Sequence, residues 1–328
     1  MKKQNLGQFN TKNDVWLRPH IREFIENSDC WNVMDPYAGA GDLLFAVNDM
    51  VWKHVYGYDI DPDLGWPVND GLEHMPYHED TIVVTNPPYL AKNSAARNAL
   101  DSYEYFTEDN DHYEDLYQIA LRRVLALYKK AVFIIPETYF QTEFFKQHLY
   151  SYTVIEENPF EDTDCPVCVA TFVTTNDFMA ITGNNYKIYK NDNYLFDRFK
   201  LEDILFDFSS CRYININFNA PTGNLGLRGV DGVDPKDKIR FCKPEDLNYD
   251  LGSIGETSRA ITVLDVDFDI TEAFLFRANF LLSKLRERTH DVVLSPFKNN
   301  NKLGQRRRRL DFKWARKIID KTVEALDK

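Results

Sequence analysis

The chain has 328 residues, which is enough for one large domain or two ordinary ones. Hydrophobic residues make up 44% of it and aromatic residues 14%, so we expect a packed core and exclude a disordered chain. No stretch approaches the roughly 18 apolar residues of a membrane span, and the start MKKQNLGQFN lacks the apolar run of a signal peptide. A cytoplasmic protein without a membrane partner is therefore expected.

Charge is unevenly distributed along the chain. The net charge of −12 argues on its own against a nucleic-acid partner. Residues 296–328, however, hold eleven Lys or Arg and four acids, including the run Arg306, Arg307, Arg308 and Arg309. Residues 101–115 hold seven acids and no Lys or Arg, which is most simply a solvated loop. The local balance, and not the total, bears on the partners of the protein.

The five cysteines occur at irregular spacing, which argues against a disulfide framework. Cys165 and Cys168 form one CxxC without a second pair, so buried strand cysteines are a better interpretation than zinc ligands. The seven histidines show no ligand spacing. We expect no metal site.

Short apolar runs alternate with amphipathic stretches between residues 31 and 176, a pattern typical of an α/β fold. A helix is predicted to begin near Glu114 and to carry Leu116, Ala120, Val124 and Leu127 on one face. We predict six strands, near residues 31–36, 54–60, 81–86, 131–136, 152–157 and 168–175.

The character of the sequence changes after Gly183 to Asn-, Asp- and Gly-rich segments with short strand-like pieces such as RYININF. Two helices are predicted further on, over TEAFLFRANFLLSKLRER and FKWARKIIDKTVEAL. We therefore place one domain at residues 1–182 and a second region, with a basic helical tail, at residues 183–328.

The segment VMDPYAGAGDLL predicts a strand, a glycine-containing turn and the start of a helix. Gly39 and Gly41 allow a backbone to approach a ligand closely, and the N-terminus of the helix adds a favourable dipole. The spacing is neither GxGxxG nor that of a P-loop, so neither NAD nor ATP is favoured.

Acidic and amide side chains end the strands that follow. Asp59 in GYDIDP ends the second strand about twenty residues after the turn, where a ribose-binding acid is found in nucleoside-binding folds. Asp70 ends another short run. In VVTNPPYLAK the prolines end a strand and hold Asn86 and Tyr89 on a stiff, extended segment. Taken alone this segment is slightly more typical of a surface turn, but together these strand ends indicate one ligand-binding edge of a sheet.

The motifs DPYAGAG, GYDIDP, ND and NPPY, in this order, resemble those of the S-adenosylmethionine-dependent adenine-N6 DNA methyltransferases. The leading GQFNTKNDV resembles the N-terminal cofactor segment of that family, and a recognition region follows the catalytic domain, as in its gamma-ordered members. The resemblance covers residues 7–176. It implies a Rossmann-like class I methyltransferase mixed sheet followed by a target-recognition region, as found in restriction-modification or phage enzymes.

The resemblance also implies roles for individual residues around S-adenosylmethionine. Thr11 would contact its methionine end, although Lys12 stands where relatives usually have proline. Asp59 would bind the ribose hydroxyls and Asp70 the adenine amino group. The turn residues that would line the cofactor are Asp35, Ala38, Gly39 and Gly41; Asn86 would border it.

The catalytic chemistry follows from the NPPY segment. The Asn86 side-chain oxygen and the Pro87 carbonyl would bind the two hydrogens of an adenine amino group, on the stiff backbone that Pro88 extends. The nitrogen then becomes more pyramidal and attacks a sulfonium methyl directly. Tyr89 would stack on the base. The segment FEDTDCPVCVATF resembles the late motif of that family whose aromatic residue stacks on the extruded base, which implies that Phe160 closes the other face. The base must leave the duplex to reach them, so base flipping is implied.

Double-stranded DNA is the expected partner, and a paired restriction endonuclease acting separately is a second one. Arg306, Arg307, Arg308 and Arg309 are expected to contact phosphates, with a solvated helix end as the alternative. In NAPTGNLGLRG, Asn224 and Arg228 have groove-reading chemistry, and a plain surface turn is equally compatible. The acidic stretch at residues 101–115 has an alternative role too, as a loop that orders on DNA binding.

Two other functions remain open. The first is a methyltransferase for RNA guanine or for the glutamine amide of release factors, because these share NPPY. The protein-modifying relatives place a helical domain before the glycine turn, whereas 34 residues precede Asp35 here. The second is a non-catalytic DNA-binding specificity module, against which the intact Asn86-Pro87-Pro88-Tyr89 argues.

Overall fold

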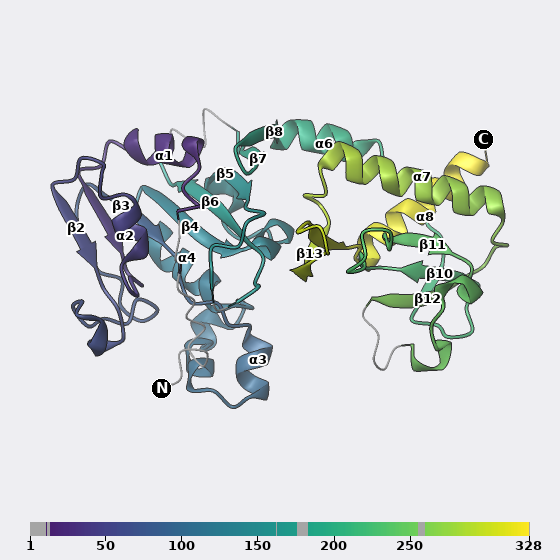
Figure 1. Ribbon diagram of the computed structural model, residues 1–328, viewed down its shortest axis with the longest axis horizontal. Coiled ribbons are helices and arrows are strands. Elements are labelled where there is room, and N and C mark those ends of the chain that lie inside the picture. The colour runs from purple at the N-terminus through teal and green to yellow at the C-terminus, as the bar shows by residue number, and fades with distance from the viewer. Residues whose placement is uncertain (1–10, 12–13, 162, 176–182, 255–259, 328) are drawn as a thin grey trace. The chain divides into compact units, whose positions relative to one another are not determined.

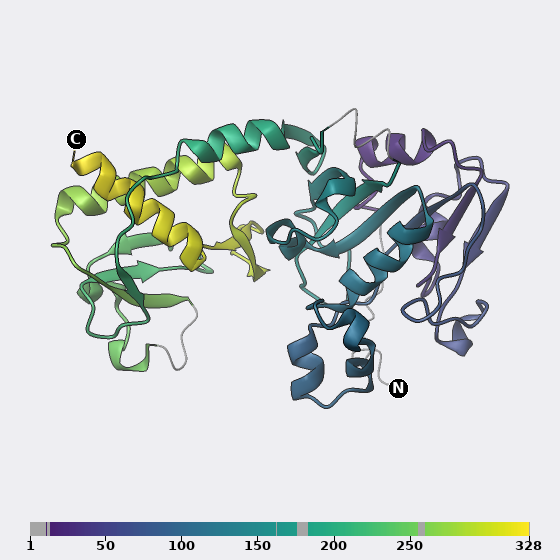
Figure 2. The ribbon, with the colours of Figure 1, turned by 180° about the vertical axis from the view of Figure 1, so that it is seen from behind.

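The computed structural model describes residues 11, 14–161, 163–175, 183–254 and 260–327. The chain divides into two compact units, residues 1–198 and residues 199–328. Figures 1 and 2 show the elements of each unit from opposite sides. None of the described helices is long and apolar enough to cross a membrane.

The first unit is built on an eight-stranded mixed sheet with the strand order β2-β1-β3-β4-β6-β5-β7-β8. Strands β2, β1, β3 and β4 are parallel to one another, whereas β6 lies antiparallel between β4 and β5. The strands are β1 (Asn32–Asp35), β2 (His54–Gly57), β3 (Thr81–Thr85), β4 (Lys130–Pro136), β5 (Leu149–Val154), β6 (Val167–Val173), β7 (Lys187–Lys190) and β8 (Asn193–Asp197).

All six strands predicted for this unit are confirmed. The residues of β1, β3 and β6 are buried throughout, which explains why these strands appear in the sequence as continuous apolar runs rather than as alternating ones. The mixed sheet with its flanking helices also confirms the predicted α/β class and the predicted mixed sheet. Strands β7 and β8 extend this sheet. The domain boundary that we expected near residue 183 precedes both strands in the chain, whereas the first compact unit ends at residue 198.

Among the described residues of this unit, the α-helices that flank the sheet are α1 (Pro19–Glu26), α2 (Asp42–Ala46), α3 (Lys92–Arg97) and α4 (Leu116–Leu127). Helix α4 begins within two residues of its predicted start because the Asp115 carboxylate accepts a hydrogen bond from the Tyr117 amide and caps it. Leu116, Ala120 and Val124 are buried as predicted, whereas Leu127 in the last turn is 45% exposed. Short 3₁₀ turns are η2 (Pro62–Leu64), η3 (Asp101–Tyr105), η4 (Glu108–Asn110), η5 (Glu137–Gln141) and η6 (Lys146–His148).

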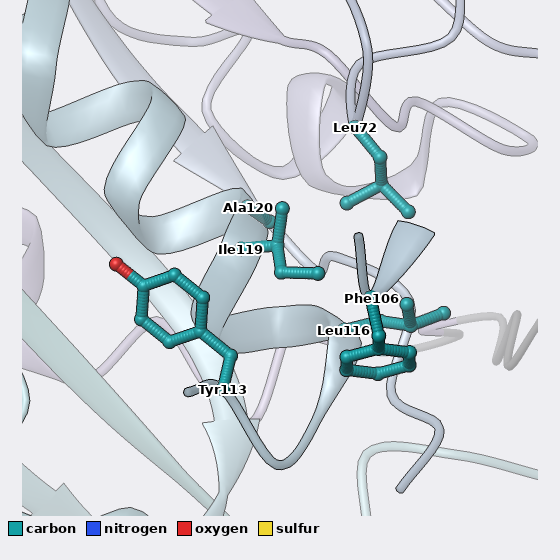
Figure 3. Packing of buried hydrophobic residues seen from close by; sticks show 6 residues of the cluster. All are labelled: Leu72, Phe106, Tyr113, Leu116, Ile119 and Ala120. Carbon is teal, nitrogen blue, oxygen red and sulfur yellow. The ribbon is translucent and has the colours of Figure 1, made fainter. Parts of the chain in front are cut away.

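The acidic stretch at residues 101–115 is more ordered than the solvated loop expected from its charge. It folds into η3 and η4, and its aromatic residues Phe106 and Tyr113 are buried. They pack with Leu72 and with residues 116, 119 and 120 of α4 in one apolar cluster, whose side chains Figure 3 shows (Leu72, Phe106, Tyr113, Leu116, Ile119 and Ala120). The prediction failed here because it rested on the seven acids and gave no weight to the aromatic residues between them.

The second unit contains a four-stranded sheet of order β11-β10-β12-β9 and a separate hairpin of β13 and β14. Helix α7 packs against α8 and β11. The elements are α6 (Arg198–Phe206), β9 (Ile216–Phe218), β10 (Leu225–Arg228), β11 (Arg240–Cys242), η7 (Pro244–Leu247), η8 (Leu251–Ser253), β12 (Ile261–Val266), α7 (Glu272–Thr289), β13 (Ser295–Asn300), β14 (Arg306–Arg309) and α8 (Phe312–Leu326). Both helices predicted for this region, α7 and α8, are confirmed.

Candidate active site

The site begins where two neighbouring parallel strands end. Asp35 is the last residue of β1, and Asn86 follows directly after β3. The Thr85 hydroxyl donates a hydrogen bond of 2.6 Å to the Asp35 Oδ1 atom, which also accepts one from the Tyr37 amide. These bonds join the two predicted halves of the site, the glycine turn and the NPPY segment, through one buried carboxyl.

Asp35 is 1% exposed, and this burial raises the pKa of its carboxyl to about 7. The hydrogen bonds from Thr85 and Tyr37 act in the opposite direction, and the nearby Asp59 raises the pKa further. The carboxyl therefore changes its charge near neutral pH.

The glycine turn lies beside the end of β2, as its spacing predicted. Gly39 and Gly41 both have positive φ, 54° and 89°, and Gly41 is the N-cap of α2. The Gly39 amide donates a 2.8 Å hydrogen bond to Asp59 Oδ2, and the Ala38 amide donates to the Tyr58 carbonyl. Asp59 is only 4% exposed, and its other oxygen accepts from the Asp61 amide.

Asp70 accepts two hydrogen bonds at the edge of the same region. The Leu72 amide donates to Oδ1 at 2.9 Å, and the Tyr105 hydroxyl donates to Oδ2 at 2.6 Å. The Tyr37 ring packs against Gly71, where an added Cβ would lie 2.7 Å from it. The Tyr37 hydroxyl is buried and has no hydrogen-bond partner among the described residues.

The NPPY segment and two distant segments form a second group. The Asn86 carboxamide donates to Thr11 Oγ1 at 3.3 Å and accepts a hydrogen bond from the Tyr89 hydroxyl. Thr11 pairs with Phe160 in an antiparallel bridge, and the rings of Tyr89 and Phe160 lie 6.3 Å apart at 59°. Tyr89 and Phe160 are both buried, at 6% and 5% exposure.

The hydrogen bond from Thr85 to Asp35 thus links the end of β1 with the strand that leads into the NPPY segment, whereas Asp70 is bonded to Leu72 and Tyr105. Pro87, buried, and Pro88, partly exposed, lie between Asn86 and Tyr89. The side chain of Asp61 takes no part in these bonds, because its carboxylate accepts from the Asp63 amide and caps η2.

Two further side chains at the site were not foreseen from the sequence. The Trp66 indole N–H donates to the Gly39 carbonyl at 2.9 Å, and its ring covers Gly57, where an added Cβ would approach it to 2.5 Å. Tyr105 reaches Asp70 from the acidic stretch. Both lie outside the recognisable motifs, so only tertiary structure brings them to the site.

Residues 80–165 match the protein family described as Eco57I restriction-modification methylase. This segment holds NPPY, the acidic stretch and Phe160. The chain resembles a restriction-modification methylase. The match supports the predicted resemblance to S-adenosylmethionine-dependent methyltransferases of the restriction-modification type. A comparison with curated proteins found no match.

The chain is also similar to solved structures, of which three are described here. A type I restriction-modification methyltransferase subunit from Streptococcus thermophilus is 16% identical, with 61% of this chain and 52% of that chain covered and a TM-score of 0.39. A protein from Listeria monocytogenes, provisionally assigned as a class I S-adenosylmethionine-dependent methyltransferase, is 15% identical, with 48% and 57% covered and a TM-score of 0.35. An rRNA methylase from Streptococcus thermophilus is 14% identical, with 46% and 92% covered and a TM-score of 0.28. The chain spans about half the length of the first two.

The fold and the family match imply S-adenosylmethionine as the cofactor, and the residues present fit it. A ribose presents hydroxyl donors and an adenine presents an amino donor, and the carboxylates of Asp59 and Asp70 are acceptors. Gly39 and Gly41 give the backbone a turn that side chains would strain. Among the described residues, no group of three or more His, Cys, Asp or Glu is placed to hold a metal ion. Cys168 is buried in β6 as predicted, whereas Cys165 precedes the strand and is partly exposed.

In the second unit, the two residues named as base readers have different surroundings. Asn224 donates to the carbonyls of Val266 and Phe268 and accepts from the Val266 amide, so its carboxamide holds the chain in place after β12. Arg228 is the last residue of β10 and is partly exposed. The Asn224 carboxamide already makes three hydrogen bonds to the backbone of the second unit, which disfavours Asn224 as a base reader.

The arginine run forms strand β14 and is not a helix end. Arg308 is 2% exposed, and its amide donates to the Asp231 carboxylate. Arg307 donates from Nε to the Asp231 carbonyl and lies over the Phe297 ring at 4.9 Å. The expectation that all four side chains contact phosphates is wrong for Arg308, because its side chain is buried. Arg306, Arg307 and Arg309 remain partly exposed.

Proposed function

We propose that the chain transfers the methyl group of S-adenosylmethionine to the N6 nitrogen of adenine in double-stranded DNA, by base flipping. The observation that carries this proposal is the grouping of Asn86, Tyr89 and Phe160 at the strand edge that also holds Asp35. It brings amide and carbonyl acceptors, two aromatic rings and the candidate cofactor turn into adjoining positions.

The chemistry follows from the poor nucleophilicity of an adenine amino nitrogen, whose lone pair is delocalised into the ring. Asn86 Oδ1 and the Pro87 carbonyl accept its two hydrogens and favour a pyramidal nitrogen. The bound cofactor supplies an electrophilic methyl on a sulfonium. Asn86 and Pro87 would hold the nitrogen while it accepts this methyl in exchange for one of its protons, which would pass to solvent.

Base capture requires a change at the two aromatic rings. A flat base between two rings needs roughly 3.5 Å on each face, or about 7 Å between parallel rings. The rings of Tyr89 and Phe160 are 6.3 Å apart and inclined at 59°, so they pack on each other. An entering base replaces this contact with stacking on both of its faces.

The distribution of charge supports different roles for the two units in DNA binding. Residues 1–198 hold 16 Lys or Arg and 31 Asp or Glu, whereas residues 199–328 hold 23 and 20. The second unit therefore supplies most of the DNA affinity, with Arg306, Arg307 and Arg309 as candidate phosphate contacts and Arg228 as a candidate base contact. A paired restriction endonuclease would act on the same DNA separately.

Expression of the chain in a host without DNA methylation, followed by single-molecule sequencing of the host DNA, tests the proposal. We expect N6-methyladenine within one recurring sequence, and none when Asn86→Ala is expressed to the same level. Methylation that appears only in RNA or protein, or only at cytosine N4, would refute it.

A further inference from the structure

The acidic stretch at residues 101–115 reaches a residue of the candidate cofactor site. Its Tyr105 donates a hydrogen bond of 2.6 Å to Asp70 Oδ2, across 35 residues of sequence. Burial of the phenol raises its pKa, and the hydrogen bond to Asp70 raises it further. The hydroxyl therefore remains a donor throughout the pH range in which a protein is studied.

Tyr105 is itself held from α4. Its backbone carbonyl accepts a 3.0 Å hydrogen bond from the buried Asn110 carboxamide, and Asn110 accepts one of 3.0 Å from Arg122. The ring packs against the apolar cluster that contains Leu72 and Phe106 (Figure 3 shows these two side chains). The backbone of Tyr105 is held by a hydrogen bond and its ring by apolar packing, so the hydroxyl is presented to Asp70 in one position.

The other hydrogen bond to Asp70 fixes the second oxygen. Leu72 N–H donates to Oδ1 at 2.9 Å, so the plane of the carboxylate is set by one donor on each oxygen. An ionised carboxylate offers about four acceptor positions, and these two bonds occupy two of them. Acceptor capacity remains on both oxygens for an amino group.

We infer that Tyr105 is a positioning residue that orients the Asp70 carboxylate toward the exocyclic amino group of the cofactor's adenine. The inference rests on the cofactor assigned to Asp70 under the proposed function. It also gives the acidic stretch at residues 101–115, which follows NPPY and α3 in the chain, a role in cofactor selection. The loop that follows the catalytic motif then forms part of the wall around the nucleoside.

The test is Tyr105→Phe, which keeps the ring in the apolar cluster and removes only the hydroxyl. Tyr103→Phe is the matched control, because Tyr103 lies in the same 3₁₀ turn, is 44% exposed and makes its ring contact with Phe106. Calorimetric titration with S-adenosylhomocysteine should show roughly three- to tenfold weaker binding for Tyr105→Phe, as expected when the net contribution of one ordinary hydrogen bond is lost, and no change for Tyr103→Phe.

A second titration separates orientation from general loosening. The analogue of S-adenosylhomocysteine that has hydrogen in place of the 6-amino group offers no donor at that position, so Tyr105 can give it no advantage through Asp70. We expect Tyr105→Phe to bind it as the unaltered chain does. Equal losses for both ligands, or no loss for either, would overturn the inference.

The two proposals fail in different ways. If the unaltered chain binds neither nucleoside, the cofactor assignment of the proposed function fails first. If it binds S-adenosylhomocysteine and methylates a substrate other than DNA, the titrations on Tyr105 still decide the inference.

Discussion

The hydroxyl of Tyr89 donates a hydrogen bond to the Asn86 carboxamide oxygen, the same atom that we propose accepts an adenine amino hydrogen. A carboxamide oxygen has two lone pairs, so it accepts both donors or exchanges one for the other. Tyr89 therefore orients the acceptor as well as offering a ring for stacking. Tyr89→Phe removes the hydroxyl and keeps the ring, so it separates the orienting role of Tyr89 from its stacking role.

Tyr89→Ala and Phe160→Ala should each weaken capture of a flipped base, because stacking contributes about 1–3 kcal/mol per base. Tyr89→Phe keeps the ring and should be much milder. The measurement is the fluorescence of 2-aminopurine at the target position, which rises when the base leaves the stack. A loss for Tyr89→Phe as large as that for Tyr89→Ala would assign the effect to the hydroxyl and not to stacking.

Asn86→Ala should abolish methyl transfer and leave cofactor binding nearly unchanged, because Asn86 is proposed to contact the amino group of the substrate. Labelled-methyl transfer and calorimetric titration with S-adenosylhomocysteine, carried out on the same preparation, measure the two effects. Weak cofactor binding with turnover preserved at saturating cofactor would contradict this role.

Asp59→Ala should have the opposite effect. Its carboxylate is proposed to bind the ribose hydroxyls, and it also accepts from the Gly39 amide, so its removal weakens cofactor binding and frees the turn. We expect a higher Kd for S-adenosylhomocysteine in calorimetric titration. Asp63→Ala, on an exposed residue of the adjoining 3₁₀ turn, is the control and should bind normally.

The sequence was sufficient to predict the strands and the order of their motifs, because strands such as β3 and β4 are short apolar runs ended by distinctive residues. The grouping of Asn86, Thr11 and Phe160 matches the predicted neighbourhood, since each belongs to a motif. Trp66 and Tyr105 were missed because single aromatic residues in turns carry no periodic signal. Arg308 was misplaced for a related reason: a run of four arginines does not indicate by itself that a strand will bury one of them.

Asp35 should make stability depend on pH. Its folded pKa, about 7, is above the ordinary value of 3.8, so the folded chain binds this proton more tightly than the unfolded chain does. The resulting stabilisation is fully present below about pH 4 and is lost as pH rises through about 7. Asp115, whose pKa burial also raises to about 7, adds a similar dependence.

Asp35→Asn keeps an oxygen that accepts from Thr85 and Tyr37 and removes the titration. Thermal unfolding at pH 5 and at pH 8 should therefore show a smaller loss of stability with rising pH for Asp35→Asn than for the unaltered chain. Asp63→Asn, on an exposed side chain, should follow the unaltered chain. Identical pH profiles for all three proteins would show that Asp35 does not titrate in this window.

The partly exposed arginines of β14 should set part of the salt dependence of DNA binding. Replacing Arg306 and Arg309 with glutamine leaves Arg308 and its bond to Asp231 in place. The slope of log affinity against log salt should then fall by up to about 0.9 for each phosphate that the protein no longer neutralises. An unchanged slope would locate the cationic surface elsewhere.

Arg308→Gln tests the structural assignment of the buried arginine. Because the Arg308 side chain is 2% exposed, this change should lower the unfolding temperature, whereas replacing the partly exposed Arg309 should have a smaller effect. A stable Arg308→Gln variant with reduced DNA affinity would restore Arg308 to the set of residues that bind phosphate.

The most direct test of the central claim is the chemical identity of the methylated product. The purified chain is incubated with isotope-labelled S-adenosylmethionine and unmethylated duplex DNA, and the digested nucleosides are separated by liquid chromatography and mass spectrometry. We predict label in N6-methyldeoxyadenosine, absent with Asn86→Ala. Label confined to N4-methyldeoxycytidine, or DNA without label when RNA or protein in parallel reactions is labelled, would contradict the account.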